Sequence, residues 1–253
     1  LFLGHVGDVE LGASALAGIW FLAIYMLGFG FSLGLQVIIA RRNGEQWYAE
    51  TGKTFFQGLF FLLILAVLLC MLSKIFSPVL LKHLITSDDV YNAVIRYLDW
   101  RIWGLLFSFP FLALRSFLVG ITQTKALNMA AFTAVLVNIP LNWLLIFGFD
   151  MGISGAAIAS SSAEMCSLAV LAAYMFRHID KKAYGLYWRI DITVLKEVFS
   201  ISVWSMLQFF TSVAIWFLFF VAIERLGETE LAVSNIVRSV SALFSVIVSP
   251  VLW

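Results

Sequence analysis

The sequence predicts an all-α integral membrane protein, and three observations support this fold class. Hydrophobic residues make up 62% of the 253 residues and charged residues only 12%, whereas soluble domains are roughly half apolar and a quarter charged. Uncharged apolar runs such as residues 55–72 are long enough, at about 1.5 Å per residue, to cross a hydrocarbon core of about 30 Å. Six such runs are separated by glycine and charged clusters, and a soluble protein would not bury so many.

These polar clusters divide the chain into seven expected helical spans. The only linker-like segment is the polar stretch 177–191. The chain begins with "LFLG", which resembles the last turn of a helix rather than a signal peptide with a basic start, so we expect a fragment. The expected spans are about 11–40, 54–76, 90–120, 126–148, 153–177 and 197–224, with an incomplete span from about 230 to 253.

The distribution of lysine and arginine predicts the orientation. Alternate span ends place ten of the 16 basic residues on one side and five on the other, and the positive-inside rule makes the first side cytoplasmic. Arg238 remains within the last span. The expected cytoplasmic residues are Arg41, Arg42, Lys53, Arg115, Lys125, Arg177, Lys181, Lys182, Arg189 and Lys196, against Lys74, Lys82, Arg96, Arg101 and Arg225 on the outer side.

One phrase occurs twice in the chain, 220 positions apart. Residues 6–14 read "VGDVELGAS" and residues 226–234 read "LGETELAVS". Six expected spans lie between the copies, so both are expected on the same, outer side of the membrane. Chance, or convergent capping by the serine that enters each helix, would explain the likeness without any repeat. A parallel repeat is the other explanation.

A parallel repeat predicts two six-helix lobes related by an axis along the membrane normal, with a substrate bound between them. On this interpretation residues 1–195 form most of a six-helix N-terminal lobe and the cytoplasmic linker, with its first helix mostly missing. Residues 196–253 begin the second lobe, with helix 7 and part of helix 8. Most of one helix would precede residue 1, and about four and a half would follow residue 253.

Two asparagines in the fifth span are candidate binding residues. Asn138 and Asn142, in "NIPLNWLLIFG", are four positions apart and share a helical face, and Pro140 between them disturbs the helix. Such amides often hold membrane helices together. The alternative is a cavity wall, where the amides and freed backbone carbonyls contact a cation or a polar substrate.

The sixth span carries an acid that needs a structural or functional partner. Glu164 lies about a dozen residues past Gly152, which is about 18 Å into the membrane at 1.5 Å per residue. A carboxylate at that depth is either protonated or paired. Ser160 lies four positions earlier on the same face. We therefore predict a binding function for Glu164 and Ser160, with a structural hydrogen bond as the alternative.

Three other intramembrane polar residues have weaker assignments. Gln36, on the glycine-rich helix "GFGFSLGLQ", lies near the inner end of its span, where an interfacial position competes with ligand binding. Gln208 would face the cavity if the second lobe mirrors the first. Arg238 would either balance an acid across the lobes or face water in an open cavity.

An aromatic and charged cluster lies near the middle of the third span. Trp100 and Trp103, beside Arg96, Asp99 and Arg101, resemble an outer aromatic belt with an i,i+3 ion pair. We expect this cluster to anchor the helix at the interface.

The sequence offers no metal site and no catalytic motif. Cys70 and Cys166 fall inside apolar runs and read as buried thiols, and His5, His83 and His178 are far apart. None of the G-x-S-x-G, H-E-x-x-H or Walker A patterns occurs. The net charge of +1 comes without a basic stripe, so we expect no nucleic-acid partner, no cofactor and no enzymatic activity.

Five segments together resemble one transporter family. In chain order they are "VGDVELGASALAG", "GLQVIIARRNGE", "ALRSFLVGITQTK", "NIPLNWLLIFG" and "GISGAAIASSSAE", and they are similar to the multidrug and toxic compound extrusion (MATE) family over nearly the whole chain. The resemblance implies a twelve-helix, two-lobed antiporter. It would expel amphipathic, often cationic compounds in exchange for protons or sodium ions.

The resemblance also assigns residues. The family's fifth-helix pair corresponds to Asn138 and Asn142, and its sixth-helix cavity positions correspond to Ser160 and Glu164. Many members carry an aspartate where this chain has Asn142, and the family's first-helix acid would lie before Leu1. Glu164 would then supply a replacement carboxylate, which leaves the coupling ion open between H⁺ and Na⁺.

The resemblance implies a monomer in a bacterial inner membrane, crossing the bilayer several times and moving a small amphipathic molecule. The alternative within the same superfamily is a flippase for lipid-linked saccharides or peptidoglycan precursors, whose cavity would be strongly cationic to hold a pyrophosphate. Most arginines and lysines here are expected at helix ends, which favours a drug exporter. A membrane enzyme acting on lipids would need clustered acids or histidines near one interface, and the sequence contains none.

Overall fold

The described part of the chain is helical apart from its connecting loops, which confirms the all-α prediction. The computed structural model describes residue 3, residues 7–187 and residues 191–248, and only the backbone of residues 8, 228 and 243–248. Its elements are α1 (Asp8–Gly44), α2 (Tyr48–Leu84), α3 (Asp88–Arg101), the 3₁₀ segment η2 (Ile102–Gly104), α4 (Leu105–Gly120), α5 (Lys125–Trp143), the π-helical segment η3 (Leu144–Gly148), α6 (Gly152–His178), α7 (Ile192–Glu224) and α8 (Glu228–Val248).

Six of the described helical segments are long and apolar enough to cross a membrane, and they match the first six predicted spans. The third span, Asp88–Gly120, combines α3, η2 and α4 in one crossing. The predicted seventh span begins as α8, and its residues 249–253 lie outside the described residues. Most helices extend a few residues beyond the predicted limits because their polar ends continue as helix.

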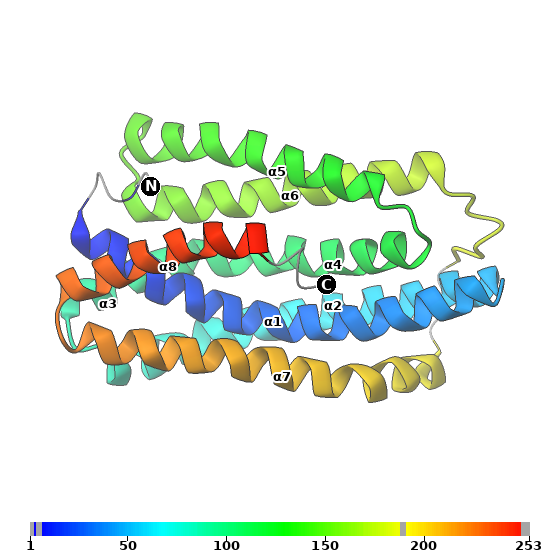
Figure 1. Cartoon of the computed structure of the whole chain (residues 1–253), viewed down its shortest axis with the longest axis horizontal. Coiled ribbons are helices and arrows are strands. Elements are labelled where there is room, and N and C mark those ends of the chain that lie inside the picture. The colour runs from blue at the N-terminus through cyan, green and yellow to red at the C-terminus, as the bar shows by residue number, and fades with distance from the viewer. Residues whose placement is uncertain (1–2, 4–6, 188–190, 249–253) are drawn as a thin grey trace.

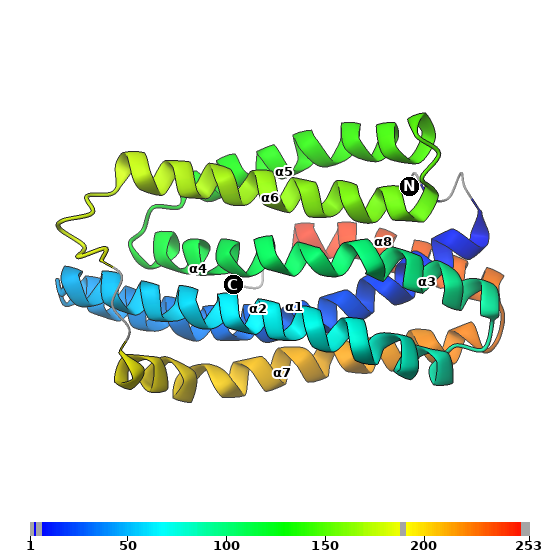
Figure 2. The ribbon, with the colours of Figure 1, turned by 180° about the vertical axis from the view of Figure 1, so that it is seen from behind.

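The helices run roughly parallel to one another in an elongated bundle (Figure 1). In both views α5 and α6 lie side by side along one edge and α7 lies along the opposite edge, with α1, α2 and α4 between them (Figure 2). The span formed by α3, η2 and α4 is the central one, since 67% of its most apolar stretch is buried, against 11% for α5. Side chains of this central span therefore meet several helices at once.

Helix α1 packs along α7 in the most extensive contact between two described helices. Glycines make this approach possible: a Cβ on Gly30 would lie 2.5 Å from Met206 Cα, and a Cβ on Gly34 would overlap Ser202. The Ser202 hydroxyl donates to the Phe31 carbonyl oxygen at 3.1 Å. The glycines of this helix therefore serve close packing against α7.

The two copies of the repeated phrase lie at the same end of the bundle, as predicted. Helices α1 and α8 both begin there (Figure 1). The Leu11 N–H donates to the Gly7 carbonyl at 3.1 Å, and the Leu231 N–H donates to the Gly227 carbonyl at 3.2 Å. The copies also touch, because Asn235 Nδ2 donates to the Leu11 carbonyl at 3.2 Å.

The serine cap that would have explained the likeness without a repeat does not form in the first copy. The N-cap of α1 is Gly7, which makes no side-chain cap hydrogen bond. Ser14 lies inside the helix, where its hydroxyl donates to the Leu11 carbonyl at 2.7 Å. A helix that begins at Asp8 has already formed two turns before it reaches this serine.

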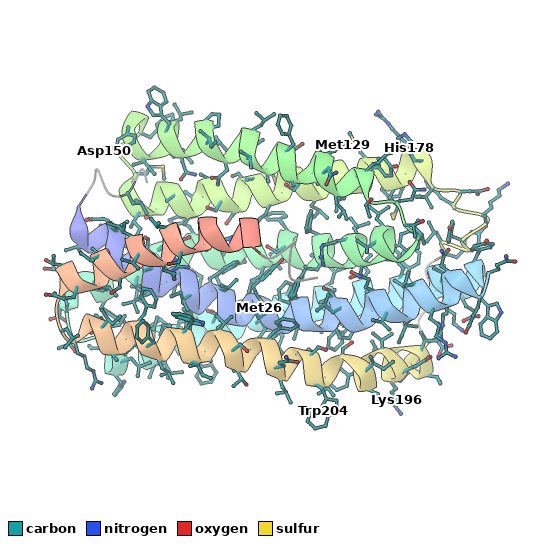
Figure 3. The ribbon with its side chains drawn as sticks, in the orientation of Figure 1. Met26, Met129, Asp150, His178, Lys196 and Trp204 are labelled. Atoms are coloured by element: carbon teal, nitrogen blue, oxygen red, sulfur yellow. The ribbon has the colours of Figure 1, made fainter. Side chains whose placement is uncertain are left out.

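The labelled side chains in Figure 3 mark the two ends of the bundle. Asp150 lies at the end where α1 and α8 begin, and His178 and Lys196 lie at the opposite end. The end with His178 and Lys196 is the predicted cytoplasmic side. Arg189, also expected there, lies outside the described residues.

Candidate functional site

Two charges that lie well inside their membrane spans form an ion pair between α3 and α6. Arg101 Nη2 lies 2.5 Å from Glu164 Oε1, and Arg101 Nη1 lies 3.0 Å from Glu164 Oε2. The Ser108 hydroxyl donates to Oε2 at 2.6 Å. The Arg101 side chain is 10% exposed and the Glu164 side chain 28% exposed. Two parallel N–H···O bonds make this a bidentate pair, the strongest common geometry for these groups.

Helix geometry brings the two side chains to one depth. Helices α3 and α6 begin at the same end of the bundle (Figure 1). Arg101 lies thirteen residues after Asp88 and Glu164 twelve after Gly152, so both lie about 18–20 Å along their helices at 1.5 Å per residue. Arg101 faces inward because it continues the buried face of α3, which carries Val90, Ala93, Val94 and Leu98.

Gly104, in the 3₁₀ turn between α3 and α4, leaves room for the pair. A Cβ at this position would overlap Arg101 Nη1 and would lie 2.8 Å from Glu164 Oε2. The Gly104 carbonyl, at 2.9 Å, is a second acceptor within reach of the Ser108 hydroxyl, whose single proton can go to it or to Glu164 Oε2. Because Gly104 has no side chain, the Arg101 guanidinium and the Glu164 carboxylate can pair close to its backbone.

Other groups surround the guanidinium. Its carbon lies 3.7 Å from the centre of the Phe21 ring, a close cation–π contact. The Ser161 hydroxyl accepts a longer bond from Arg101 Nη1 at 3.5 Å, and Tyr97 also interacts with Arg101. An unpaired charge at this depth would be costly, so the pairing explains how both charges are tolerated.

A cavity of about 180 Å³ lies beside Glu164. Its walls are mostly apolar, with the carboxylate, two serines and a tyrosine as residues that carry polar groups, and four helices contribute to it. Arg101 is not part of its lining, so the carboxylate stands between the guanidinium and the cavity. The lining residues are Tyr25, Ser108, Phe111, Ala130, Ala131, Ala134, Glu164 and Ser167.

The structure brings only one of the predicted site residues to this cavity. Glu164 is paired, which is one of the two states expected for it. Ser160 donates to the Ala156 carbonyl at 3.0 Å within its own helix. Asn142 Nδ2 donates to both the side-chain and the main-chain oxygen of Asn138 at 2.9 Å. Neither asparagine lines the cavity, and both amides are engaged with one another.

The remaining predicted polar residues lie elsewhere. Gln36 is half-buried, and its Oε1 has no hydrogen-bond partner among the described residues. Gln208 is exposed on α7. Arg238 Nη2 donates to Asn235 Oδ1 at 3.0 Å. None of these three lines the cavity beside Glu164.

The expected role of Arg101 as an interfacial anchor is wrong. Its side chain turns inward, away from Trp100 and Trp103, which are each about half exposed, as expected of an aromatic belt. The expected i,i+3 ion pair is also replaced, because Asp99 pairs with Lys74 Nζ at 2.6 Å. The helical spacing from Val90 to Arg101 is the sequence signal that identifies the buried face.

A second charged cluster lies at the predicted cytoplasmic end, where α7 begins. Lys53 Nζ lies 2.7 Å from Asp191 Oδ2, and Arg42 Nη2 lies 2.8 Å from Glu197 Oε2. Asp191 is also the N-cap of α7 and accepts from the Thr193 N–H at 2.9 Å. The hydrogen bond from Lys53, with those from the α7 backbone, lowers the pKa of the Asp191 carboxyl below its ordinary value of 3.8.

Among the residues whose side chains are described, no three His, Cys, Asp or Glu residues gather closely enough to hold a metal ion. Cys70 and Cys166 are both free thiols. His5 lies outside the described residues.

Comparisons with known proteins agree with this fold. A family model described as MatE matches residues 1–144. The chain is 26% identical over 250 residues to "Probable multidrug resistance protein NorM" of Shewanella oneidensis, covering 95% of this chain and 54% of that protein. It is 24% identical over 243 residues to the protein of the same name from Rhizobium meliloti, covering 93% and 52%. The chain thus spans about half the length of these curated relatives.

Solved structures share the fold at low sequence identity. One is described as the inward-facing conformation of a multidrug resistance MATE family transporter, with a TM-score of 0.87, 22% identity and coverage of 97% of this chain and 56% of that one. Another is the eukaryotic MATE transporter AtDTX14, with a TM-score of 0.80, 20% identity and coverage of 94% and 54%.

The six apolar helices confirm the predicted multi-pass membrane location, and the relatives named above are bacterial proteins. The family match extends from the start of the chain through α5 and into η3, and therefore covers more than half of the 253 residues. The chain belongs to the MatE family, the multidrug and toxic compound extrusion transporters that its sequence resembles.

Proposed function

We propose that the protein is a secondary active antiporter that exports amphipathic, often cationic compounds in exchange for protons or sodium ions. The observation that carries this proposal is the Glu164 carboxylate, placed about 18 Å along α6 beside a mostly apolar cavity of about 180 Å³. An intramembrane acid facing a cavity is the usual mark of an ion or substrate pathway. The relatives' name, multidrug resistance protein, agrees with it.

The mechanism requires one carboxylate to respond to two ligands. A protonatable acid of the first lobe, either Glu164 or the first-helix acid implied by the family resemblance, would bind the coupling ion and the exported compound in turn. Binding of one then favours release of the other, a reciprocal coupling that holds for any two linked ligands. Rocking of two lobes around a midplane site would expose that site alternately to each side of the membrane.

A flippase for lipid-linked saccharides or peptidoglycan precursors is the second candidate, and one observation favours it. Two arginines lie within the membrane span Asp88–Gly120: Arg101 pairs with Glu164, and Arg115 Nη1 is buried without a hydrogen-bond partner among the described residues. Guanidinium groups bind phosphates well. The interior basic charge that a pyrophosphate needs is therefore larger than the sequence suggested.

Transport by the full-length protein in proteoliposomes separates the two candidates. An antiporter moves a cationic dye when a proton or sodium gradient is imposed, with each gradient varied alone. A flippase moves a lipid-linked pyrophosphate saccharide and leaves the dye in place.

Glu164→Gln tests the mechanism in the same vesicles. We expect it to remove the dependence of dye efflux on the ion gradient, because an amide does not exchange a proton or bind sodium as a carboxylate does. Glu45→Gln is the matched control, since Glu45 pairs only with Arg41 at the exposed end of α1. Ion-dependent efflux that persists in correctly folded Glu164→Gln protein removes Glu164 from the mechanism.

A further inference from the structure

We propose that Arg101 is a tethered cation that masks the Glu164 carboxylate, so that a cationic ligand binds Glu164 only by displacing the guanidinium. This inference rests on the proposed function for its physiological meaning, since the ligand displaced against Arg101 would be the exported compound. It adds a residue that determines which cations bind and how tightly.

The carboxylate has little free capacity while Arg101 is in place. An ionised carboxylate offers about four acceptor positions. Arg101 occupies two of them, at 2.5 and 3.0 Å, and the Ser108 hydroxyl takes a third at 2.6 Å. A cation that enters the cavity therefore meets an acid that is already neutralised.

The geometry still lets a ligand reach Glu164 from the cavity. Glu164 and Ser108 line the cavity, whereas Arg101 does not. The glutamate side chain is 28% exposed, against 10% for the arginine. A ligand therefore approaches the carboxylate from the side away from the guanidinium, without first passing Arg101.

The guanidinium has other contacts when it loses the acid. Its carbon lies 3.7 Å from the centre of the Phe21 ring, and Ser161 accepts from Nη1 at 3.5 Å. Cation–π contacts are strongest where water is excluded. These partners reduce the penalty of separating the pair, which makes exchange possible without expelling Arg101 into lipid.

Masking makes a quantitative prediction about binding. When only a fraction of the protein has a free site, the apparent Kd equals the intrinsic Kd divided by that fraction. If Arg101 covers Glu164 for nine-tenths of the time or more, removing the guanidinium lowers the apparent Kd by about tenfold or more.

The test measures binding of tetraphenylphosphonium, a cation without hydrogen-bond donors, to the purified full-length protein by equilibrium dialysis. We expect Arg101→Gln to lower the Kd by about tenfold or more relative to wild type. Glu164→Gln and the double variant Arg101→Gln/Glu164→Gln should both bind weakly, and Glu164→Gln the more weakly because its unpaired Arg101 repels the cation. Unchanged or weaker binding by folded Arg101→Gln overturns the inference, as does tight binding by the double variant.

Arg101→Lys keeps the test decisive if Arg101→Gln does not fold. Lysine retains the charge but loses the two-pronged geometry of the guanidinium, so it should mask less completely and give a Kd between those of wild type and an unmasked site. A Kd equal to or above the wild-type value contradicts masking. Because these measurements need no transport, absence of dye efflux would count against the proposed function while leaving the binding result separate.

Discussion

The α1–α7 contact and the Arg101–Glu164 pair join helices by opposite means. Along α1 and α7 the contact is between backbones: a Cβ on Gly30 would lie 2.5 Å from Met206 Cα, and Ser202 donates to the Phe31 carbonyl. Between α3 and α6 the contact is between the tips of two long, charged side chains.

This difference separates what holds the helix bundle together from what can exchange a ligand. Small residues let membrane helices approach closely, and the resulting contact loosens only when whole helices move apart. Side-chain tips rearrange by rotation about a few bonds. The glycine contact therefore suits a fixed support, and the ion pair beside the cavity suits a site whose partner changes.

The largest effect is expected from breaking the ion pair on one side only. Glu164→Gln leaves the Arg101 charge, 10% exposed, without an acid, and should reduce the free energy of unfolding by about 3–5 kcal/mol. Arg101→Gln should cost less, because the remaining carboxylate borders a cavity that water can enter. Unfolding in detergent measures both.

The double variant Arg101→Gln/Glu164→Gln completes this comparison. Removing both charges leaves no unpaired ion, so the double variant should be more stable than Glu164→Gln alone. Additive losses from the two substitutions would mean that the pair contributes no coupling energy.

Gly30→Ala tests the backbone contact and should have the next largest effect. The added methyl meets the Met206 backbone, which cannot turn aside as a side chain does, so we expect a loss of about 1–3 kcal/mol. Gly18→Ala is the matched control on the same helix, because nothing lies within 4 Å of its added Cβ. It should be neutral, or stabilising by up to about 1 kcal/mol. Equal changes in the free energy of unfolding at both positions would show that the α1–α7 contact can accommodate an added methyl group.

Gly104→Ala applies the same change at the ion pair. Here the methyl meets Arg101 Nη1 and Glu164 Oε2, both at the ends of flexible side chains. Moving them off their preferred rotamers should cost about 0.5–1.5 kcal/mol, less than Gly30→Ala. Since the pair is pushed apart, tetraphenylphosphonium should also bind more tightly than to wild type. Unchanged binding would indicate that the pair adapts without loosening.

Much of the fold follows from composition and spacing. The apolar runs predict the first six spans, because a lipid-embedded helix must satisfy its backbone internally and present apolar side chains. The shared side of the two repeated phrases follows from counting an even number of crossings. The serine cap does not follow, because the helix begins at Asp8, before the serine is reached.

The candidate site is less predictable, because a single-sequence pattern gives depth and face but not partners. The distance of Glu164 from Gly152 indicates a deep acid that needs a proton or a partner. Its partner Arg101 lies beside Trp100 and Trp103, and this pattern predicted an interfacial anchor instead. Only packing of α3 against α6, sixty residues apart in the chain, identifies the pair. The sequence likewise gives no sign that Gly104 leaves room for this pair.

The smallest effect concerns the charged contacts at the start of α7, at the predicted cytoplasmic end. The Asp191 carboxyl has a pKa below 3.8 in the folded protein because Lys53 and the start of α7 stabilise its ionised form. Its contribution to stability is therefore fully present above pH 3.8, and it is lost as the pH falls through the lowered pKa. The unfolding temperature of wild type should therefore fall more steeply below that pH than the unfolding temperature of Asp191→Asn.

Asparagine is the informative replacement at this position because it still caps α7 through its side-chain oxygen while removing the charge. Lys53→Met removes the other partner of the ion pair. It should also weaken the fall of the unfolding temperature at acid pH, since the ammonium at 2.7 Å is the first cause of the lowered pKa. If both variants keep the full wild-type acid dependence, the charges at this end contribute nothing to the attachment of α7. The glycine contact with α1 would then contribute more to holding that helix than the charges at this end.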